Sequence, residues 1–493
     1  MKLQSNTEEH STVSKVYRGL SSQALIVIAK GVLEMSVFAL MSRLLTPEDF
    51  GFYAIIVAVT SVFQCLTESG LGSAVIQKKD ASKGYISTAL GLSVILGIIF
   101  AVLLIVLAEP LSMLMGQGRE LVRSLRLMSI TLLLFSVNSV ARALFMRTLD
   151  FFRFGLCEML AYVISSAIGI VMAARGYGVD AIIASAIANT VLTTCILFGI
   201  KRDSINLKIH RACARDIVSY GGWLTGSVIV RRITTELDKL ILSRWVPVAL
   251  IGAYNRPSTF ISRITDQVNG VYDTVLFPIL SSLQDDVAQL RSSFLKSISL
   301  VSWFSVILGA GFFLCSEIII NIFFGSDWLW LVNIFRVLAL SVPFLAYSRI
   351  GDCFFRSLGL VKSYFYIRVV VCIFTILCIY IGCKYDIMGV AIGVVISRVF
   401  DSIVKIIYLS YKISVSLLDV VKVVVGPAWV TLLVATLSYA VVANIVYGEY
   451  LGILMFGAIG IVLLLCFPKL FGADYYESVY AVAKSKIMKL RHR

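Results

Sequence analysis

The sequence predicts an all-α polytopic membrane protein of about 14 transmembrane helices, of which twelve form two copies of a six-helix unit and two more follow. Hydrophobic residues make up 59% of the 493 residues and charged residues only 15%, which is too little polar surface for a soluble protein. Apolar runs of about 20 residues recur along the chain, which is the length of a spanning helix and excludes alternating transmembrane strands. One motif occurs twice, and it defines the repeat.

The repeated motif reads Ser-Arg, seven further residues, then Gly-x-Tyr, and its copies are Ser42–Tyr53 and Ser243–Tyr254. Proline and glycine interrupt helices and tyrosine suits the lipid headgroup layer, so each copy predicts a turn between two spans at the membrane surface. Further matches extend the repeat: Leu125–Leu127 with Phe335–Val337, and Tyr177 with Tyr385.

The spans are expected in chain order, with short connections between them. The first apolar run is too long for a signal-peptide core and lacks a small-residue cleavage site, so we expect it to be retained. The repeat predicts an N-lobe at 1–205, a C-lobe at 206–415, and two extra helices with a basic tail at 416–493. The expected spans are 20–42, 50–72, 86–108, 123–146, 155–174, 179–200, 217–242, 249–275, 294–316, 329–354, 363–382, 387–410, 423–446 and 450–471.

Basic residues between the spans indicate the orientation. About 25 lie on the side of the N-terminus and about six on the other, so the positive-inside rule places both termini and the 201–216 connection in the cytoplasm. An even number of spans in each repeat gives both repeats the same orientation. We therefore expect two lobes related by an axis along the membrane normal, with a central cavity between them.

Several kinds of chemistry find no support in the sequence. The ten cysteines are scattered singly through apolar runs, which is typical of packing thiols, and the three histidines lie outside the spans. The chain has neither a Gly-x-x-x-x-Gly-Lys-Ser/Thr phosphate loop nor a Ser/His/Asp set within the membrane. The net charge is +15, and the basic residues lie in the connections between the spans. This distribution is typical of residues that orient a membrane protein, and it does not indicate nucleic-acid binding. We expect no cofactor, no metal site and no enzyme activity.

Four stretches resemble bacterial polysaccharide exporters of the Wzx type. They are Ser42–Tyr53 running into Glu68–Asp80, Ala141–Leu144 followed by Arg147, Asp238–Arg244, and Leu276–Gln284. The resemblance covers most of the first twelve spans and keeps the order of the motifs. It implies the fold of the multidrug/oligosaccharidyl-lipid/polysaccharide exporter superfamily, in the bacterial inner membrane.

The resemblance also implies an activity, namely flipping a polyprenyl-diphosphate-linked oligosaccharide from the cytoplasmic to the periplasmic leaflet. Such a cargo is an O-antigen, capsule or exopolysaccharide repeat unit, and a polysaccharide polymerase and chain-length proteins are the implied partners. Two alternatives stay open. The first is a multidrug or other lipid-linked precursor exporter of the same superfamily, and a multidrug exporter favours acidic cavity walls. The second is a membrane polymerase or ligase, which needs a sizeable periplasmic loop that the sequence lacks.

Cations within the spans are the candidates for binding the diphosphate, because a charge at mid-bilayer costs about 2.5–3.5 kcal/mol and is by default paired or functional. Lys30 and Arg231 hold the same register in the two repeats, which predicts two cations at one depth on opposite cavity walls. Arginine binds phosphate oxygens bidentately, while lysine supplies a point charge. Arg256 and Arg263 predict a cationic track along the eighth span.

Acidic residues in the spans offer the alternative that these cations are merely neutralised, by Lys30–Glu34, Arg231–Asp238 and Arg263–Asp266 pairs. The same class of residue supplies the candidates for coupling transport to an ion, which are Glu34, Asp238 and Glu68.

Two predicted hairpins carry opposite charges at equal depth. Arg142 and Glu158 each lie eight residues from a turn, or about 12 Å of helix. Asp352 and Arg368 repeat the arrangement 210 residues later with the signs exchanged. We expect two structural ion pairs, and Arg142 is also kept as a substrate-binding candidate.

Overall fold

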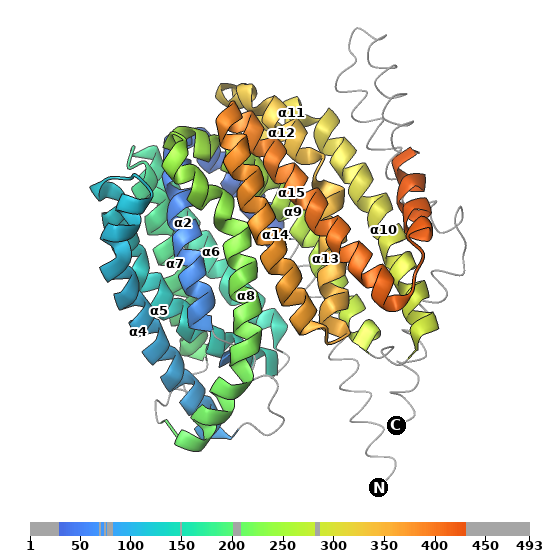
Figure 1. Ribbon diagram of the computed structural model, residues 1–493. Coiled ribbons are helices and arrows are strands. Elements are labelled where there is room, and N and C mark those ends of the chain that lie inside the picture. The colour runs from blue at the N-terminus through green and yellow to red at the C-terminus, as the bar shows by residue number, and fades with distance from the viewer. Residues whose placement is uncertain are drawn as a thin grey trace. The chain divides into compact units, whose positions relative to one another are not determined.

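The computed structural model describes residues 29–68, 71–72, 75, 82–147, 150–200, 209–281 and 286–429, and these ranges are helical apart from short turns (Figure 1). The expected span at 450–471, most of 423–446 and the start of 20–42 lie outside the described residues. The chain divides into two compact units, Met1–Asn255 and Arg256–Arg493. The three-part division at 205/206 and 415/416 stays a prediction.

The first unit is built from helices that mostly pack as neighbours in chain order. Its helices are residues 29–44, α2 (Pro47–Glu68), α4 (Lys83–Leu114), α5 (Arg119–Arg147), α6 (Phe151–Ala174), α7 (Val179–Ile200), α8 (Arg211–Trp245) and the start of α9 (Val248–Ser281). α4 packs along α5, and α6 along α7, while α2 contacts both α5 and α8. In Figure 1, α4 and α5 lie side by side.

The outer surface of this unit is apolar. On α4, Ile98, Ile99 and Val102 are exposed, and on α6 the exposed residues include Leu160 and Ile164. A soluble protein rarely exposes such continuous stripes, whereas lipid chains cover them without cost. The opposite side of α6 is buried, so the helix has one face for lipid and one for protein.

The second unit contains the rest of α9 and a second set of helices. They are α10 (Val287–Leu314), α11 (Ser316–Phe323), η2 (Ser326–Leu331), α12 (Val332–Ala339), α13 (Val342–Ser357), α14 (Val361–Gly382), η3 (Cys383–Tyr385), α15 (Asp386–Ile413) and residues 417–429. α15 packs against α12, α13 and α14, and α10 packs against α12 and α13. Phe294 of α10 and Phe354 of α13 meet edge to face in the buried core of this unit.

The expected span at 329–354 is not one straight helix. Its two helical parts, Ser326–Ala339 and Val342–Ser357, are bent by 43° at a short break. Pro343 lies in the first turn of α13, where its missing N–H and fixed φ begin a new helix instead of continuing the old one. Arg398 of α15 donates to the hydroxyl of Ser341 at 2.7 Å and so stabilises the break.

α14 and α15 form an antiparallel hairpin around η3. A Cβ on Gly393 would lie 2.6 Å from the carbonyl oxygen of Cys378, and one on Gly389 would lie 2.5 Å from that of Gly382. Only glycine allows the two backbones to approach this closely, as in other membrane helix pairs. The single 52-residue apolar stretch Lys362–Ile413 therefore folds back on itself.

The described part of the chain contains seven helical stretches long and apolar enough to cross a membrane, or eight if the bent pair counts as one span. Several spans in one chain make this a multi-pass membrane protein, as the composition predicts. The full number of spans stays a prediction.

Candidate functional site

The α5–α6 hairpin brings Arg142 and Glu158 together. Nη2 of Arg142 lies 2.7 Å from Oε1 of Glu158, so the ion pair expected from their equal distance to the turn is formed. Three residues nearer the turn on α5, Phe145 packs against Phe154 of α6, with ring centroids 5.9 Å apart. These two contacts define the register of the hairpin.

The α13–α14 hairpin of the second unit repeats this register. Nη2 of Arg368 lies 2.5 Å from Oδ2 of Asp352, which forms the second expected ion pair. Phe355 packs against Tyr364, with centroids 5.5 Å apart. Each contact is that of the first hairpin shifted by 210 residues, so the repeat inferred from the sequence has a structural counterpart here.

In each hairpin, the arginine guanidinium lies over the aromatic ring near the start of the second helix. The Arg142 guanidinium lies 5.2 Å from the centroid of the Phe154 ring, and that of Arg368 lies 5.1 Å from the Tyr364 ring. In the first unit the cation comes from the facing helix, and in the second it comes from the same helix. The arginine therefore stacks on the equivalent aromatic ring in both hairpins, although the positions of the cation and the anion are exchanged.

Lys30 completes the charge cluster of the first unit. Its Nζ lies 3.0 Å from Oε2 of Glu158, so the carboxylate carries one cation on each oxygen. Lys30 thus pairs with a carboxylate of α6, and its expected neutralisation by Glu34 one turn away stays a prediction. We call Lys30, Arg142 and Glu158 the α5–α6 triad.

Lys30 reaches Glu158 because helix 29–44 runs parallel to α6. Lys30 meets Glu158 and Met41 meets Gly169, and both contacts join residues 128 positions apart. A constant separation over three helical turns means that both helices run in the same direction. This parallel packing holds Lys30 at the depth of the α5–α6 pair.

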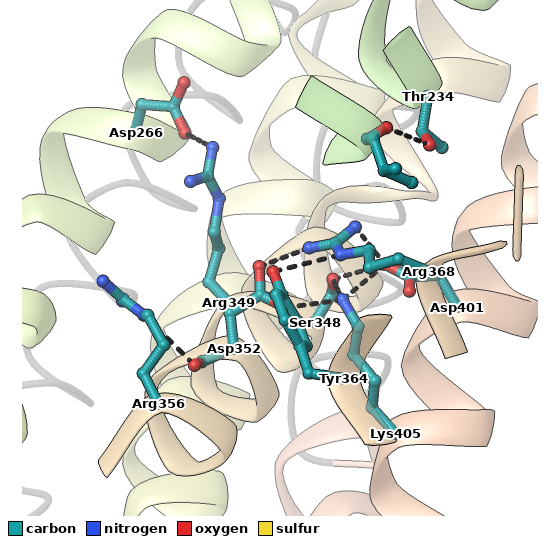
Figure 2. A network of polar contacts seen from close by, with 11 residues as sticks. Thr234, Asp266, Ser348, Arg349, Asp352, Arg356, Tyr364, Arg368, Asp401 and Lys405 are labelled. Atoms are coloured by element: carbon teal, nitrogen blue, oxygen red, sulfur yellow. Dashed lines mark hydrogen bonds and ion pairs between the residues drawn. The ribbon is translucent and has the colours of Figure 1, made fainter. Parts of the chain in front are cut away.

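α15 completes the cluster of the second unit with two more charges, as Figure 2 shows. Nζ of Lys405 lies 2.7 Å from Oδ1 of Asp352 and 2.9 Å from Oδ2 of Asp401, and it donates to the Ser348 hydroxyl at 2.7 Å. Arg368 donates from Nε to the hydroxyl of Tyr364 at 3.1 Å. We call Asp352, Arg368, Asp401 and Lys405 the α15 cluster.

The two clusters differ in charge and in access. The α15 cluster has two cations and two anions, and its Lys405 is fully buried, with 0% of the residue exposed. The α5–α6 triad has two cations and one anion, and 55% of the Arg142 side chain is exposed. A neutral, sealed cluster stabilises packing, whereas an accessible cluster with one excess positive charge can bind an anion.

The remaining candidate residues are dispersed. Asp238 of α8 is buried and accepts a hydrogen bond from the Tyr254 hydroxyl at 2.9 Å. Arg256 is buried on α9, whereas Arg263 is exposed. Asp266 pairs with Arg349 of α13 at 2.7 Å, and the expected Arg263–Asp266 pair stays a prediction.

Some candidates lie where no side chain is described. The side chains of Arg231 and Glu68 fall in this group, so the Arg231–Asp238 pair and the symmetric placement of Lys30 and Arg231 stay predictions. Among the described residues no group of three or more histidine, cysteine, aspartate and glutamate side chains gathers as a metal site would require.

The sequence interpretation missed Asp401 and Lys405. A signal for them exists, since an aspartate and a lysine one helical turn apart in the middle of an expected span form a local pair. It missed the Lys30–Glu158 contact because no turn sets the register between two helices so far apart in sequence.

Comparison with known proteins agrees with the expected resemblance. A family model described as polysaccharide biosynthesis protein matches residues 40–333. Lipopolysaccharide biosynthesis protein WzxC of Escherichia coli (strain K12) is 24% identical over 316 residues, which cover 64% of this chain and 63% of that protein. Succinoglycan biosynthesis transport protein ExoT of Rhizobium meliloti (strain 1021) is 24% identical over 304 residues, 61% of each chain. The chain thus matches less than two thirds of the length of these two relatives.

Solved structures show the fold. The lipid II flippase MurJ in an inward closed conformation aligns with a TM-score of 0.72 at 17% identity, covering 92% of this chain and 99% of that one. An inward-facing multidrug transporter of the MATE family aligns with a TM-score of 0.63 at 16% identity, covering 79% and 98%. The family model and the WzxC match confirm the resemblance to Wzx-type exporters, and the solved structures show the fold.

Proposed function

Because the chain belongs to the polysaccharide biosynthesis protein family, we propose that it flips a polyprenyl-diphosphate-linked oligosaccharide from the cytoplasmic to the periplasmic leaflet of the bacterial inner membrane. The cargo is the repeat unit of an O-antigen, capsule or exopolysaccharide. The chain acts by alternating access, opening its binding site to one leaflet at a time. A polysaccharide polymerase and chain-length proteins would take up the product.

The α5–α6 triad carries this proposal. More than half of the Arg142 side chain is exposed, although Arg142 lies about 12 Å of helix from the end of its hairpin. Exposure of an arginine side chain to lipid at that depth is costly. The exposed part of Arg142 is therefore better explained if it faces a space that water or cargo can reach. The excess positive charge of the triad suits a diphosphate rather than a cationic drug.

Energy for transport would come from an ion gradient or from the cargo gradient. Glu34, Asp238 and Glu68 stay the candidates for ion coupling. Asp238 is buried on α8 and accepts a hydrogen bond from Tyr254 of the repeated motif, and this link to the turn supports a role for it in coupling.

Reconstitution tests the proposal. The purified chain is placed in liposomes that contain a fluorescent short-chain polyprenyl-diphosphate oligosaccharide, and a membrane-impermeant reductant quenches the label in the outer leaflet. A flippase exposes the label of both leaflets, so quenching continues past the outer-leaflet fraction. Empty liposomes and an Arg142→Gln variant serve as controls. Quenching should stop at the outer-leaflet fraction in the empty liposomes, and it should pass that fraction more slowly with the variant than with the wild type.

Other outcomes favour the alternatives. Ethidium transport by the same liposomes, without lipid flipping, would support a multidrug exporter, whose fold neighbours include the MATE transporter. Elongation of the oligosaccharide without flipping would support a polymerase. Either result contradicts the proposed function.

A further inference from the structure

Equivalent positions in the two units have diverged. In this part of the repeat, equivalent positions are 208 residues apart, as Tyr177 and Tyr385 are. The α7 residue equivalent to Asp401 is therefore Thr193, and the one equivalent to Lys405 is Leu197. At these two positions α7 therefore supplies no charge to the first hairpin. Lys30 takes that place from a different helix, which leaves Glu158 as the single carboxylate of the triad.

Glu158 occupies the position that an anionic ligand would take. Its two oxygens each hold one cation, Arg142 at 2.7 Å and Lys30 at 3.0 Å. A phosphate group presents its oxygens in the same way, and arginine and lysine are its usual partners. Without Glu158 the two cations would lie together inside the membrane with twice the excess charge, which is unfavourable until an anion arrives.

We infer that Glu158 is an internal counter-anion that the diphosphate of the cargo displaces from Lys30 and Arg142. This inference rests on the proposed function. It deepens that function by assigning binding of the diphosphate headgroup to the first unit, and by proposing that the Glu158 carboxylate weakens binding of the headgroup. A transporter must bind its cargo weakly enough to release it. Glu158 provides that, because it competes for the cations and repels the bound anion.

The α15 cluster does not bind the headgroup in this scheme. Its cations already have two carboxylates and the Ser348 hydroxyl as partners, and Lys405 is sealed from solvent. A diphosphate would need to displace both aspartates from a fully buried position. The pseudo-equivalent hairpins thus have different tasks, one binding and one structural.

Equilibrium binding tests the inference. The full chain in lipid nanodiscs is titrated with farnesyl diphosphate, with farnesol as the uncharged counterpart and inorganic pyrophosphate as the soluble one. Glu158→Gln removes the competing charge but keeps the shape, so affinity for farnesyl diphosphate should rise about tenfold or more. Arg142→Gln and Lys30→Gln should each lower it about tenfold. Farnesol affinity should not change in any variant.

A matched control exists in the same unit. Glu109 of α4 pairs with Arg126 of α5 at 2.7 Å, but this pair is exposed. Glu109→Gln makes the same chemical change as Glu158→Gln, and it should leave farnesyl diphosphate affinity within about twofold. Thermal unfolding reports whether each variant is folded, and Glu158→Asp, which keeps the charge but shortens the reach, should raise affinity by less than Glu158→Gln.

The outcomes separate the inference from the proposed function. Wild-type binding of farnesyl diphosphate with unchanged or weaker binding by both Glu158 variants overturns the inference and leaves the function standing. Absence of wild-type binding, with folded protein, overturns both. Competition by inorganic pyrophosphate as strong as that by farnesyl diphosphate assigns the triad to a free diphosphate and overturns the lipid-linked assignment.

Discussion

Gly51 and Gly252 hold the same place in the two copies of the repeated motif, and α2 and the first turns of α9 touch at these two residues. A Cβ on Gly51 would lie 1.9 Å from the carbonyl oxygen of Val248, and one on Gly252 would lie 1.8 Å from that of Pro47. Pro47 and Val248 are themselves equivalent in the repeat, so the two contacts are reciprocal. Such reciprocal contacts indicate a local two-fold axis that relates the two glycine segments within the first unit.

Alanine at either glycine should prevent this packing. The clash is with backbone atoms, which cannot rotate away, and overpacking of this kind costs about 1–3 kcal/mol. Gly51→Ala and Gly252→Ala should each lower the melting temperature in detergent by at least about 2–4 °C. Gly199→Ala is the matched control, because a Cβ there meets nothing within 4 Å. Equal melting temperatures for all three variants would contradict the described contact.

Exchange of charges in the first hairpin tests whether the triad acts as a unit. Arg142→Glu with Glu158→Arg restores the pair of the hairpin and copies the signs at 352 and 368, but it leaves Lys30 facing an arginine. Adding Lys30→Glu inverts all three signs. Folded yield, measured by size-exclusion chromatography of a fluorescent fusion, should be low for the double variant and recover in the triple variant.

Export separates folding from cargo binding in the same series. The triple variant should fold but not support surface polysaccharide, because its site carries an excess negative charge and repels a diphosphate. Recovery of polysaccharide together with folding would mean that the triad is structural. Full recovery of yield in the double variant would mean that Lys30 does not contact Glu158.

The α5–α6 and α13–α14 pairs could be predicted because a helical hairpin sets its own register. Residues at equal distance from a turn lie at equal depth, and this rule sufficed to pair Arg142 with Glu158 and Asp352 with Arg368. The membranous, all-helical character followed equally directly from the length of the apolar runs.

The rest depended on contacts between elements that no turn connects. Lys30 is 128 residues from Glu158, and Lys405 is 53 residues from Asp352, so tertiary packing alone brings them together. The break at 340–341 could not be predicted from hydropathy, because the apolar pattern of the expected span continues through Pro343. The proline itself is a local signal for the end of a helix.

The α15 cluster should be far more sensitive to loss of one charge than an exposed pair. Lys405→Met leaves two aspartates with one arginine in a sealed site, and breaking a buried pair costs about 3–5 kcal/mol. Lys405→Met with Asp401→Asn restores neutrality and should regain much of the loss. Thermal unfolding of the purified variants measures both effects.

An exposed pair in the same unit provides the comparison. Arg349 and Asp266 lie 2.7 Å apart, but 39% and 53% of their side chains are exposed, so Asp266→Asn should cost no more than about 1 kcal/mol. A loss of stability in the Asp266 variant equal to that in Lys405→Met would show that burial does not set the cost. Failure of the double variant to regain stability would show that Asp401 is not the charge that Lys405 balances.

Membrane orientation is the last prediction, and it rests on two separate arguments. Three apolar helices, α5, α6 and α7, lie between the turn at Gly118 and the connection around residue 208, so we expect these two sites on opposite faces of the membrane. The excess of basic residues, including Lys201, Arg202 and Lys208, predicts that the connection lies in the cytoplasm. A phosphatase that is active only in the periplasm, fused after residue 208, should therefore be inactive, and the same fusion after Gly118 should be active. The reverse pattern would contradict the orientation but keep the three crossings, whereas equal activity at both sites would contradict the crossings themselves.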